Sequence, residues 1–296
     1  MFKKIKAFLY SFILLFYSLY KYFFHLITGK CTLLRIIHSK YSNAKKYMLL
    51  ENNIKDSLKL DKTKLLHELS ESKLKDNVLD VIKSKNVKDE FHEEFSYFIM
   101  NMCHLHTKYK SLINEVTILK NEKVDIENID HKERLLLIWK TLKPEIEMDP
   151  AFVSNLWSEI GFQGKDPQTD FRGMGTLGLI QLEYFAINSP LTAYEIISNS
   201  RDISQGFPLA IAAINFTALL FEMLCDYRLK LYFYSLPIDS INLTTFNNLF
   251  VAAFSAFHKH WCTVNPGLMQ FNIEKDKFET VLSNELNDEL IIHKYI

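Results

Sequence analysis

Hydrophobic and polar positions follow a helical spacing along most of this chain. Between residues 51 and 130, apolar side chains return every three or four positions, which is typical of helices with one buried face. The strongest of these stripes consists of Phe91, Phe95, Phe98, Ile99 and Met102, and we expect it to pack in the core. Weaker stripes predict two more helices, the second of them short; they consist of Leu58, Leu65, Leu66 and Leu69, and of Val78, Val81 and Ile82.

Start and stop signals for helices accompany the apolar pattern from residue 132 onward. An N-cap residue followed by proline suits the first turn of a helix, and such pairs occur at Asp149-Pro150, Asp166-Pro167 and Ser189-Pro190. The first pair opens a predicted helix that ends at Gly161. Its apolar face consists of Phe152, Val153, Leu156, Trp157 and Ile160. The second pair predicts only a short helical turn.

The remaining pattern completes an all-α prediction. Further helices are expected at residues 135–142, 177–185, 208–225, 244–261 and 274–292. The segment 208–225 is apolar nearly all round, so we place it at the centre of a helix bundle. Asn215 and Glu222 within it argue against a membrane span. Alternating strand patterns are not evident, and the predicted fold is a multi-helix, bundle-like domain preceded by a helical N-terminal region.

An uncharged apolar segment lies near the N-terminus, at residues 7–20, and apolar residues resume after Lys21 as far as Ile27. The uninterrupted part is short for a bilayer-spanning helix, which needs about twenty residues. Four interpretations stay open. They are a cleaved secretory signal, although no small-residue cleavage site follows, a membrane anchor or hairpin insert, an interfacial aromatic helix, and a buried helix of the soluble domain. We expect residues 1–28 to associate with a membrane.

Charge is unevenly distributed along the chain. Basic and acidic side chains number 35 each, so the formal net charge is zero. The first fifty residues nevertheless carry nine basic and no acidic side chains. A basic, acid-free segment next to an apolar one favours an anionic, cytoplasm-facing membrane surface. We therefore expect an intracellular protein on the cytoplasmic face of endomembranes, such as the endoplasmic reticulum or a lipid-droplet-like surface, together with a cytosolic pool.

Several kinds of site are not indicated by the sequence. The four cysteines are far apart and form no CxxC pair, so we expect reduced, mostly packed thiols. The phosphate-binding GxxxxGK[ST] and the GxSxG of serine hydrolases are missing. Residues 173–178 do read GxGxxG, but no strand is predicted before them, so a dinucleotide site is not indicated. The basic patch with interleaved aromatics that nucleic acid requires is absent from the helical domain. We expect no cofactor, no resident metal ion and no nucleic-acid partner.

A glycine-rich polar stretch interrupts the helical pattern. Five of the eight glycines fall between Gly161 and Gly178, in the sequence GFQGKDPQTDFRGMGTLG. Glycine permits positive φ angles and the close approach of another backbone, here that of a partner. Arg172 follows Asp170 by two residues and precedes Gly173. Asp170 can orient the guanidinium through a charge-assisted hydrogen bond, and a guanidinium presented in this way suits a carboxylate or a phosphate.

The residues alone leave two interpretations of Arg172 open. Arg172 either ties the loop together through Asp166 and Asp170, or it presents its guanidinium to a partner. An arginine that a partner protein inserts into a GTPase stabilises charge on the transferring phosphoryl group, an effect of about 10³–10⁵ in rate. Gln163, Thr169 and the aspartates suit capping and turn positions in either interpretation.

The same stretch resembles the signature of the ELMO (engulfment and cell motility) domain. The resemblance is carried by Trp157-x-x-x-Gly161-Phe162-Gln163-Gly164 and by Asp166-Pro167-x-Thr169-Asp170-Phe171-Arg172-Gly173-x-Gly175-x-Leu177. The aromatic N-terminus followed by Thr28-Gly29-Lys30-Cys31 is similar to the short ELMO-domain-containing proteins. The chain has no room for the armadillo-like and pleckstrin-homology regions of the long scaffold members.

This resemblance implies a domain organisation and a function. The expected parts are a membrane-associating segment at 1–28, a helical N-terminal region at 29–131 and an ELMO domain at 132–290. The short branch activates GTP hydrolysis by Arf and Arf-like GTPases without a zinc finger. Arg172 is then the arginine finger that enters the GTP-bound partner, and the chain has no catalytic site of its own. The supporting or interface residues are Trp157, Gly161, Phe162, Gln163, Gly164, Asp166, Pro167, Thr169, Asp170, Gly173 and Gly175.

Two other functions remain open from the sequence. The chain can be a non-catalytic adaptor that binds a small GTPase or a scaffold partner through the same loop, as the long family members act through scaffolding. It can also be chiefly a membrane tether, a function that the basic N-terminus suggests. The preferred GTPase does not follow from any motif.

Overall fold

The protein folds into helices joined by turns and loops. The computed structural model describes residues 23, 27–57, 60, 65–66, 70–148, 152–200 and 206–295. These residues contain no β-strand, so the all-α prediction is confirmed. The chain divides into two compact units, Met1–Thr107 (unit 1) and Lys108–Ile296 (unit 2). Of the helices described, none is long and apolar enough to cross a membrane; the predicted membrane segment lies mostly outside the described residues.

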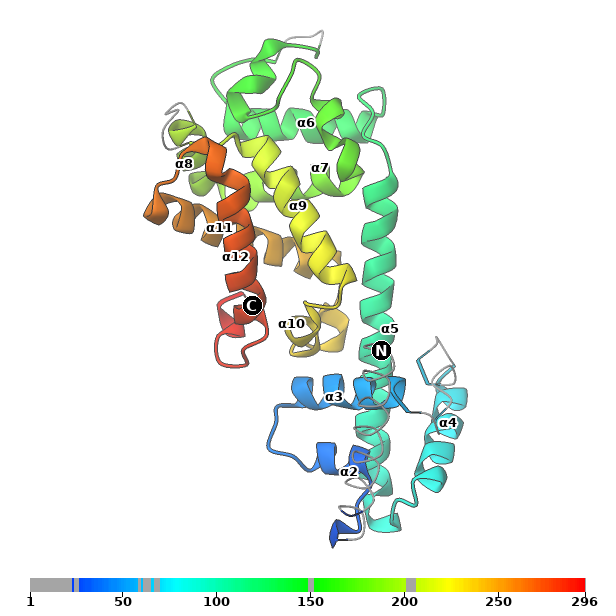
Figure 1. The fold of residues 1–296 in the computed structure, drawn as a ribbon. Helices are drawn as coiled ribbons and strands as arrows, with labels where there is room; N and C mark the ends of the chain where they lie inside the picture. Colours follow the sequence, from blue (N-terminus) through cyan, green and yellow to red (C-terminus); the bar gives the residue numbers. More distant parts are fainter. Residues whose placement is uncertain are drawn as a thin grey trace, which may run out of the picture. The chain divides into compact units, whose positions relative to one another are not determined.

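Unit 1 is built on the first part of α5 (Figure 1). Its helices are α2 (Thr32–Ile37), α3 (Asn43–Lys55), α4 (Glu71–Ser84), the 3₁₀ helix η2 (Asp89–Phe91) and α5 (His92–Asn121) as far as Thr107. Ser42 caps α3, because its side chain accepts a hydrogen bond from the backbone N–H of Lys45. α2 packs against α3.

The core of unit 1 contains the predicted aromatic stripe. Phe95, Ile99 and Met102 are fully buried and Phe98 is nearly so, which confirms the prediction for these four residues. Phe91, at the start of the stripe, is only half-buried. One charged group, Glu51, is also fully buried. Its Oε1 lies 2.9 Å from His106 Nδ1 and 2.5 Å from Lys55 Nζ, and a buried carboxylate requires such partners.

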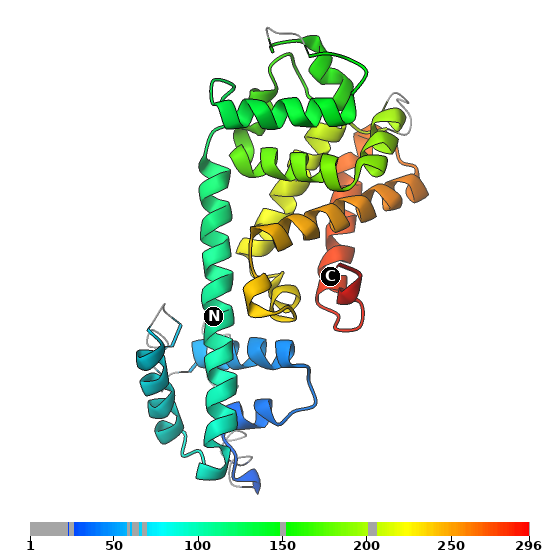
Figure 2. The same cartoon turned by 180° about the vertical axis from the view of Figure 1, so that it is seen from behind.

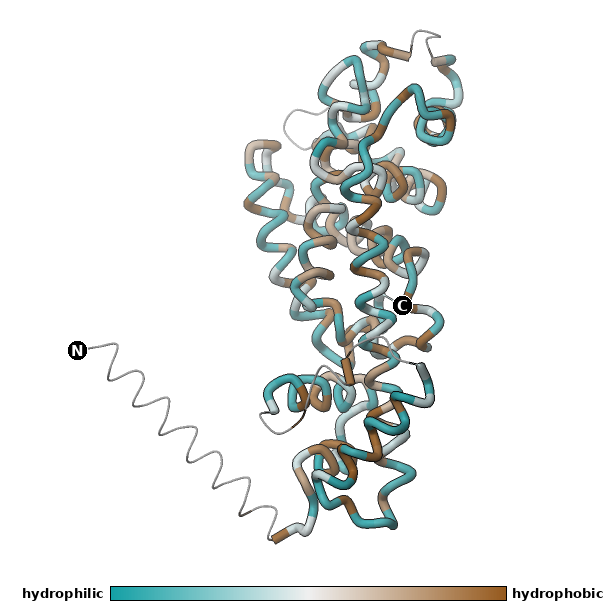
Figure 3. The backbone as a smooth tube through the Cα atoms, turned by 90° about the vertical axis from the view of Figure 1, so that its right-hand side faces the viewer, coloured by the Kyte–Doolittle hydropathy of each residue, from teal (hydrophilic) through white to brown (hydrophobic). Residues whose placement is uncertain are grey.

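Unit 2 holds the remaining helices. They are α5 from Lys108, α6 (Ile129–Leu142), η3 (Asn155–Ile160), η4 (Pro167–Gly173), α7 (Gly175–Asn188), α8 (Pro190–Asn199), α9 (Leu209–Cys225), α10 (Lys230–Tyr234), η5 (Ile238–Ser240), α11 (Leu243–Val264), η6 (Leu268–Gln270), α12 (Phe271–Leu286) and η7 (Ile292–Tyr295). α6 lies alongside α7, and α7 also packs on α9 and α11 (Figures 1 and 2). Hydrophobic and hydrophilic residues alternate along these helices (Figure 3), as amphipathic helices in a bundle require.

Helix α9 occupies the centre of unit 2, as predicted. It packs against α7, α8, α11 and η4, and its side chains are buried on most sides. An aromatic cluster joins it to the neighbouring helices: the Phe216 ring lies 5.2 Å from Phe254 and 5.1 Å from Phe257, and Phe254 lies 4.9 Å from Phe185. Edge and tilted contacts at these separations stabilise the core beyond simple area burial.

The predicted helix opened by Asp149-Pro150 is wrong in its first half. Asp149 and Pro150 lie outside the described residues, and Phe152 has a φ of 62°, which no α-helix accepts. The backbone N–H of Ser154 donates to the carbonyl of Lys165 at 2.9 Å, so this stretch is bound to the glycine-rich loop instead. Only the short 3₁₀ helix η3 follows.

Two other predicted helices differ from the structure. The last one, expected at 274–292, is α12 at Phe271–Leu286; the chain then turns, since the N–H groups of Ile291 and Ile292 both donate to the carbonyl of Asp288. In unit 1, the predicted helix over residues 58–69 is not seen at Leu65 and Leu66, which lie in a turn. The rest of that prediction lies largely outside the described residues.

Candidate functional site

Aromatic side chains form the base of the glycine-rich loop, which we call the arginine loop (residues 161–175). Trp157 is fully buried, and its indole N–H donates to the carbonyl of Phe152 at 2.8 Å. Its ring lies 5.5 Å from Phe162, which in turn lies 5.7 Å from Phe171. Pro167 is buried as well. The aromatic members of the motif therefore act as the core on which the loop rests, and Trp157 and Phe162 are not available to a partner.

Gly161 lets the start of α9 approach the loop. Its φ is 91°, and a Cβ at this position would lie 2.4 Å from the backbone nitrogen of Leu209. The carbonyl of Gly161 accepts a hydrogen bond from Ile211 N–H at 3.2 Å. Only glycine satisfies both the positive φ and this close approach. The expected close approach is thus made here by the protein's own backbone rather than by a partner.

Asp166 begins the helical turn η4, as predicted. Its side-chain oxygens accept hydrogen bonds from the backbone N–H and the side-chain amide of Gln168, at 3.1 and 2.7 Å. Its carbonyl accepts the Thr169 hydroxyl at 2.9 Å. This is a side-chain N-cap with proline in the first turn. Asp166 therefore shapes the turn that carries the arginine.

Asp170 has a different partner from the one expected. Its Oδ2 accepts the backbone N–H of Gln163 at 2.8 Å, so it closes the loop between its two ends. The expected hydrogen bond to Arg172 is replaced by one in which Arg172 Nε donates to the carbonyl of Thr169 at 2.7 Å. Gln163 itself is exposed. Backbone geometry and not a carboxylate thus orients the guanidinium.

Arg172 is exposed on the surface of unit 2. Its one hydrogen bond within the described residues uses Nε, and no ion pair to Asp or Glu is formed there. The two terminal nitrogens therefore remain for a ligand, in the planar fork that pairs with a carboxylate or a phosphate through two hydrogen bonds. The interpretation in which Arg172 ties the loop to Asp166 and Asp170 does not agree with these contacts.

The other glycines of the arginine loop fall into two classes. A Cβ on Gly175, whose φ is 51°, would lie 2.3 Å from the carbonyl oxygens of Lys120 and Glu122. Gly175 therefore permits close packing of the protein on itself. By contrast, a Cβ on Gly164 or Gly173 would meet nothing within 4 Å. These two positions are open, and Gly173 directly follows Arg172 in the chain.

The end of α5 is bound firmly to the start of α7. The carbonyl of Glu122 accepts the Thr176 backbone N–H at 2.9 Å. The Thr176 hydroxyl lies 3.3 Å from Nε2 of His131, whose Nδ1 accepts the backbone N–H of Asp125 at 3.1 Å. His131 and Thr176 are both buried. This network joins two segments about fifty residues apart and holds them beside the arginine.

A pocket of about 510 Å³ opens between these segments. We call it the basic pocket; it is lined by Lys120, Asn121, Glu122, Lys123, Val124, Gln168, Thr169, Phe171, Arg172, Gly173 and Gly175. The pattern of residues 120–124 does not predict a functional site, because two lysines at the end of a helix are common on protein surfaces. Only the fold brings them next to Arg172.

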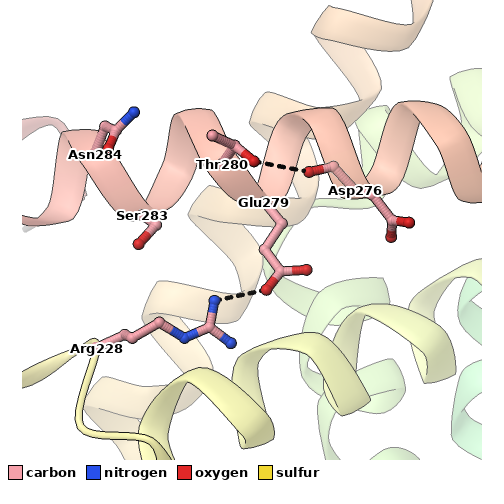
Figure 4. Close-up of a pocket in the computed structure, with 6 residues that line it drawn as sticks. All are labelled: Arg228, Asp276, Glu279, Thr280, Ser283 and Asn284. Atoms are coloured by element: carbon pink, nitrogen blue, oxygen red, sulfur yellow. Dashed lines mark hydrogen bonds and ion pairs between the residues drawn. The ribbon is translucent and has the colours of Figure 1, made fainter. Parts of the chain in front are cut away.

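A second pocket, of about 330 Å³, lies between α12 and the segment after α9 (Figure 4). Arg228 enters it but is already bound there, because its Nη1 donates to Glu279 at 2.6 Å. Thr280 donates to the carbonyl of Asp276 within its own helix. Ser283 and Asn284 complete the lining. Among these six residues, no side-chain base forms a hydrogen bond to a hydroxyl group that could act as a nucleophile. The arginine loop is therefore the stronger candidate.

A cysteine–histidine pair lies on α11, outside the loop. Cys262 Sγ is 3.7 Å from Nε2 and 3.8 Å from Nδ1 of His258, and Glu195 lies 3.5 Å from the same imidazole. Burial raises the pKa of Cys262, with a further rise from Glu195, while burial lowers the pKa of His258. The thiol is therefore protonated near neutral pH. This pair lacks the depressed thiol pKa of an activated nucleophile.

Burial also affects the thiol of Cys103, whose pKa is raised to about 12 by burial and by the nearby Glu51 carboxylate. No group of three or more His, Cys, Asp or Glu residues that could hold a metal ion occurs in the described part of the chain. The four cysteines are free. Cys103 is buried, Cys31 and Cys225 are half-buried and Cys262 is exposed, so the expectation of packed thiols is fully met at Cys103 alone.

Comparison with known proteins defines the class. A model of the ELMO/CED-12 family matches residues 114–274, which includes the whole arginine loop and the segment that faces it. The chain belongs to the ELMO/CED-12 family. This confirms the resemblance seen in the motif.

Within that family, the chain is similar to ELMO domain-containing protein 2 of Homo sapiens, with 35% identity over 273 residues that cover 90% of this chain and 91% of the relative. It is 31% identical to ELMO domain-containing protein 1 of Bos taurus, over 90% and 87% of the two chains. It is 30% identical to ELMO domain-containing protein B of Dictyostelium discoideum, over 93% and 96%. No solved structure matches the chain.

Proposed function

We propose that this chain is a GTPase-activating protein for an Arf or Arf-like small GTPase, and that Arg172 acts as its arginine finger. The observation that carries the proposal is the state of Arg172: exposed, held at Nε by the Thr169 carbonyl, and free at both terminal nitrogens among the described residues. Membership of the ELMO/CED-12 family supports it. GTP and its Mg²⁺ belong to the partner.

The proposed mechanism is electrostatic. Arg172 enters the partner's nucleotide site and its planar fork meets the oxygens of the transferring phosphoryl group, where negative charge accumulates. Thr169 positions the guanidinium, and Asp170 and Asp166 hold the turn in shape. The open space at Gly173, which follows Arg172 directly, and at Gly164 leaves room for the partner to come close. Because the group is held before docking, little ordering is needed at the moment of reaction.

The test is single-turnover GTP hydrolysis by a panel of purified Arf and Arf-like GTPases. The wild-type chain is compared with Arg172→Lys, which keeps the charge but loses the fork, and with Arg172→Ala. We expect Arg172→Ala to lose about 10³-fold or more of the acceleration and Arg172→Lys to lose most of it. Arg228→Lys is the matched control, since Arg228 is already paired with Glu279, and it retains full activity. Equal rates for the wild type and Arg172→Lys would exclude the finger mechanism.

An adaptor function would use the same exposed loop as an interface. It predicts that the chain binds the GTP-loaded partner while the rate of hydrolysis stays unchanged. Measuring binding and hydrolysis with the same GTPase therefore separates the two functions.

We propose further that residues 1–28 bring the protein to the cytoplasmic face of an endomembrane. The support is the sequence itself: an apolar segment inside a region with nine basic and no acidic residues. Such a location would bring the chain to membrane-bound GTPases.

A further inference from the structure

We propose that the basic pocket beside Arg172 docks an acidic side-chain cluster on the surface of the GTPase that Arg172 enters. This inference rests on the proposed function and names the part of the interface that recognises the partner. The residues that carry it are Lys120 and Lys123 at the end of α5, which lie in one pocket with Arg172.

The charge of the pocket is the first argument. Three cationic residues, Lys120, Lys123 and Arg172, are among those that line it, together with one acidic residue, Glu122. Glu122 Oε1 lies 4.0 Å from Nε2 of the buried His131. None of the three cations forms an ion pair with a carboxylate in the part of the chain that the structure describes. An excess of unpaired positive charge in a concave site attracts anionic groups.

The rigidity of the pocket is the second argument. One wall is bound to the other by the Thr176 N–H to Glu122 carbonyl bond, at 2.9 Å, and by the Ile126 N–H to Gln168 side-chain bond, at 3.4 Å. A site formed in advance loses little conformational entropy when a partner docks.

The position of the pocket identifies the occupant. Thr169, Arg172 and Gly173 belong to the arginine loop and also line the pocket. A protein that receives Arg172 in its nucleotide site therefore covers the mouth of the pocket. An anionic lipid headgroup in the same place would compete with that protein, so carboxylates on the GTPase are the occupant that agrees with the loop.

Lysines at such a site act differently from the finger. They attract the partner and hold its orientation, and they do not contact the phosphoryl group. Charges of this kind chiefly change the association rate and its dependence on salt. Their removal thus raises KM and leaves the rate at saturation nearly unchanged, whereas loss of Arg172 lowers the rate at saturation.

The experiment measures binding and hydrolysis with one GTPase from the panel, using full-length chains at several ionic strengths. The variants are Lys120→Glu/Lys123→Glu and Lys120→Arg/Lys123→Arg. Lys140→Glu/Lys259→Glu is the matched control, because both lysines are exposed and neither lines the pocket. Thermal unfolding followed by circular dichroism checks that each variant is folded.

We expect the Glu pair to lower kcat/KM at least tenfold at low salt, with kcat retained and the salt dependence reversed, because salt screens the new repulsion. The Arg pair and the control stay within about twofold of the wild type. If the Glu pair has an unchanged kcat/KM while Arg172→Lys is inactive, the basic pocket does not dock the GTPase, and the proposed function remains intact.

Two other outcomes are also decisive. If the wild type binds a GTP-loaded partner without accelerating hydrolysis, and the Glu pair loses that binding, the docking pocket stands and the activator function fails. If the Glu pair loses only its binding to phosphatidylserine vesicles and keeps the wild-type kcat/KM, the pocket serves a lipid and the inference is overturned.

Discussion

At the residue scale, the glycines of one loop have two distinct tasks. Gly161 and Gly175 have positive φ angles and backbone neighbours that leave no space for a Cβ. Gly164 and Gly173 face open space. The first pair forms the loop and the second leaves its surface clear, so substitutions of the two pairs separate stability from docking.

Gly175→Ala is expected to destabilise the protein. The new Cβ would lie 2.3 Å from two backbone oxygens, at a φ of 51°, so the segments that meet there must separate. A loss of about 3 kcal/mol in the free energy of unfolding is the expected size for such strain in a packed site. Urea unfolding measures it. Gly173→Ala serves as the control, with a change of about 0.5 kcal/mol; similar losses for both variants would contradict this account.

Asp170 is expected to act through an acceptor oxygen and not through its charge. Its carboxylate binds the backbone N–H of Gln163, and an asparagine amide oxygen can replace it in that contact. Asp170→Asn should therefore keep the larger part of the GTPase acceleration, whereas Asp170→Ala loses the loop closure and about 1 kcal/mol of stability. Single-turnover hydrolysis decides between them. Equal loss of activity in both variants would mean that the negative charge itself orients Arg172.

At the element scale, buried polar groups join helices whose apolar faces alone do not determine their register. In unit 2, Glu274 of α12 is 2% exposed, and it accepts hydrogen bonds from Lys277 at 2.7 Å and from His260 of α11 at 3.1 Å. The Lys277 contact is the main cause that holds the pKa of Glu274 below its ordinary value of 4.5; burial opposes this, and His260 adds to it.

The stability that Glu274 provides should depend on pH. Because its pKa is lower in the folded state than in the unfolded state, folding favours the ionised form. This contribution is complete above the ordinary pKa of 4.5 and is lost as the pH falls through the lower folded pKa. Glu274→Gln should thus be less stable than the wild type at pH 7, and the difference should shrink below pH 4.5.

Urea unfolding of both proteins between pH 7 and pH 3.5 measures that difference. Asp276→Asn, on the same helix but exposed, is the matched control and should show a small difference at every pH. A Glu274→Gln deficit that stays constant down to pH 3.5 would show that the lost hydrogen bonds, and not the charge, account for the effect.

At the scale of the whole molecule, the basic N-terminal region and the more acidic remainder suit different surroundings. The nine cations of the first fifty residues favour an anionic bilayer. In the proposed function, the arginine loop presents Arg172 to a GTPase. A chain arranged in this way would activate that GTPase at the membrane where it is bound.

Deletion of residues 1–28 is expected to move the protein from the membrane pellet to the soluble fraction of a cell lysate. Each apolar residue removed makes membrane binding less favourable. The basic residues removed with them weaken the attraction to anionic lipids. Sedimentation followed by immunoblotting measures the partition. Arg172→Ala should remain in the pellet. Unchanged sedimentation of the deleted chain would contradict the membrane assignment.

Local and periodic features of the structure could be predicted from the sequence. The stripe around Phe95 and the apolar segment 208–225 are buried because helical period alone decides which side chains share a face. The Asp166-Pro167 turn forms because an N-cap and a proline act within four residues. By contrast, the helix expected after Pro150 is shortened by a contact to Lys165 that no local pattern contains.

The sequence by itself determined the all-α class, the family and the loop in which Arg172 lies, since these depend on residue types at short spacing. The tertiary structure alone decided that Asp170 binds Gln163 instead of Arg172, that Gly175 accommodates the end of α5, and that Lys120 and Lys123 share a pocket with the arginine. The physical reason is that the contacts of Gly175 and of the pocket join segments about fifty residues apart, and that between Asp170 and Gln163 depends on how the whole loop closes. Their geometry follows from how helices pack in three dimensions, which is not set by the spacing of residues along either segment.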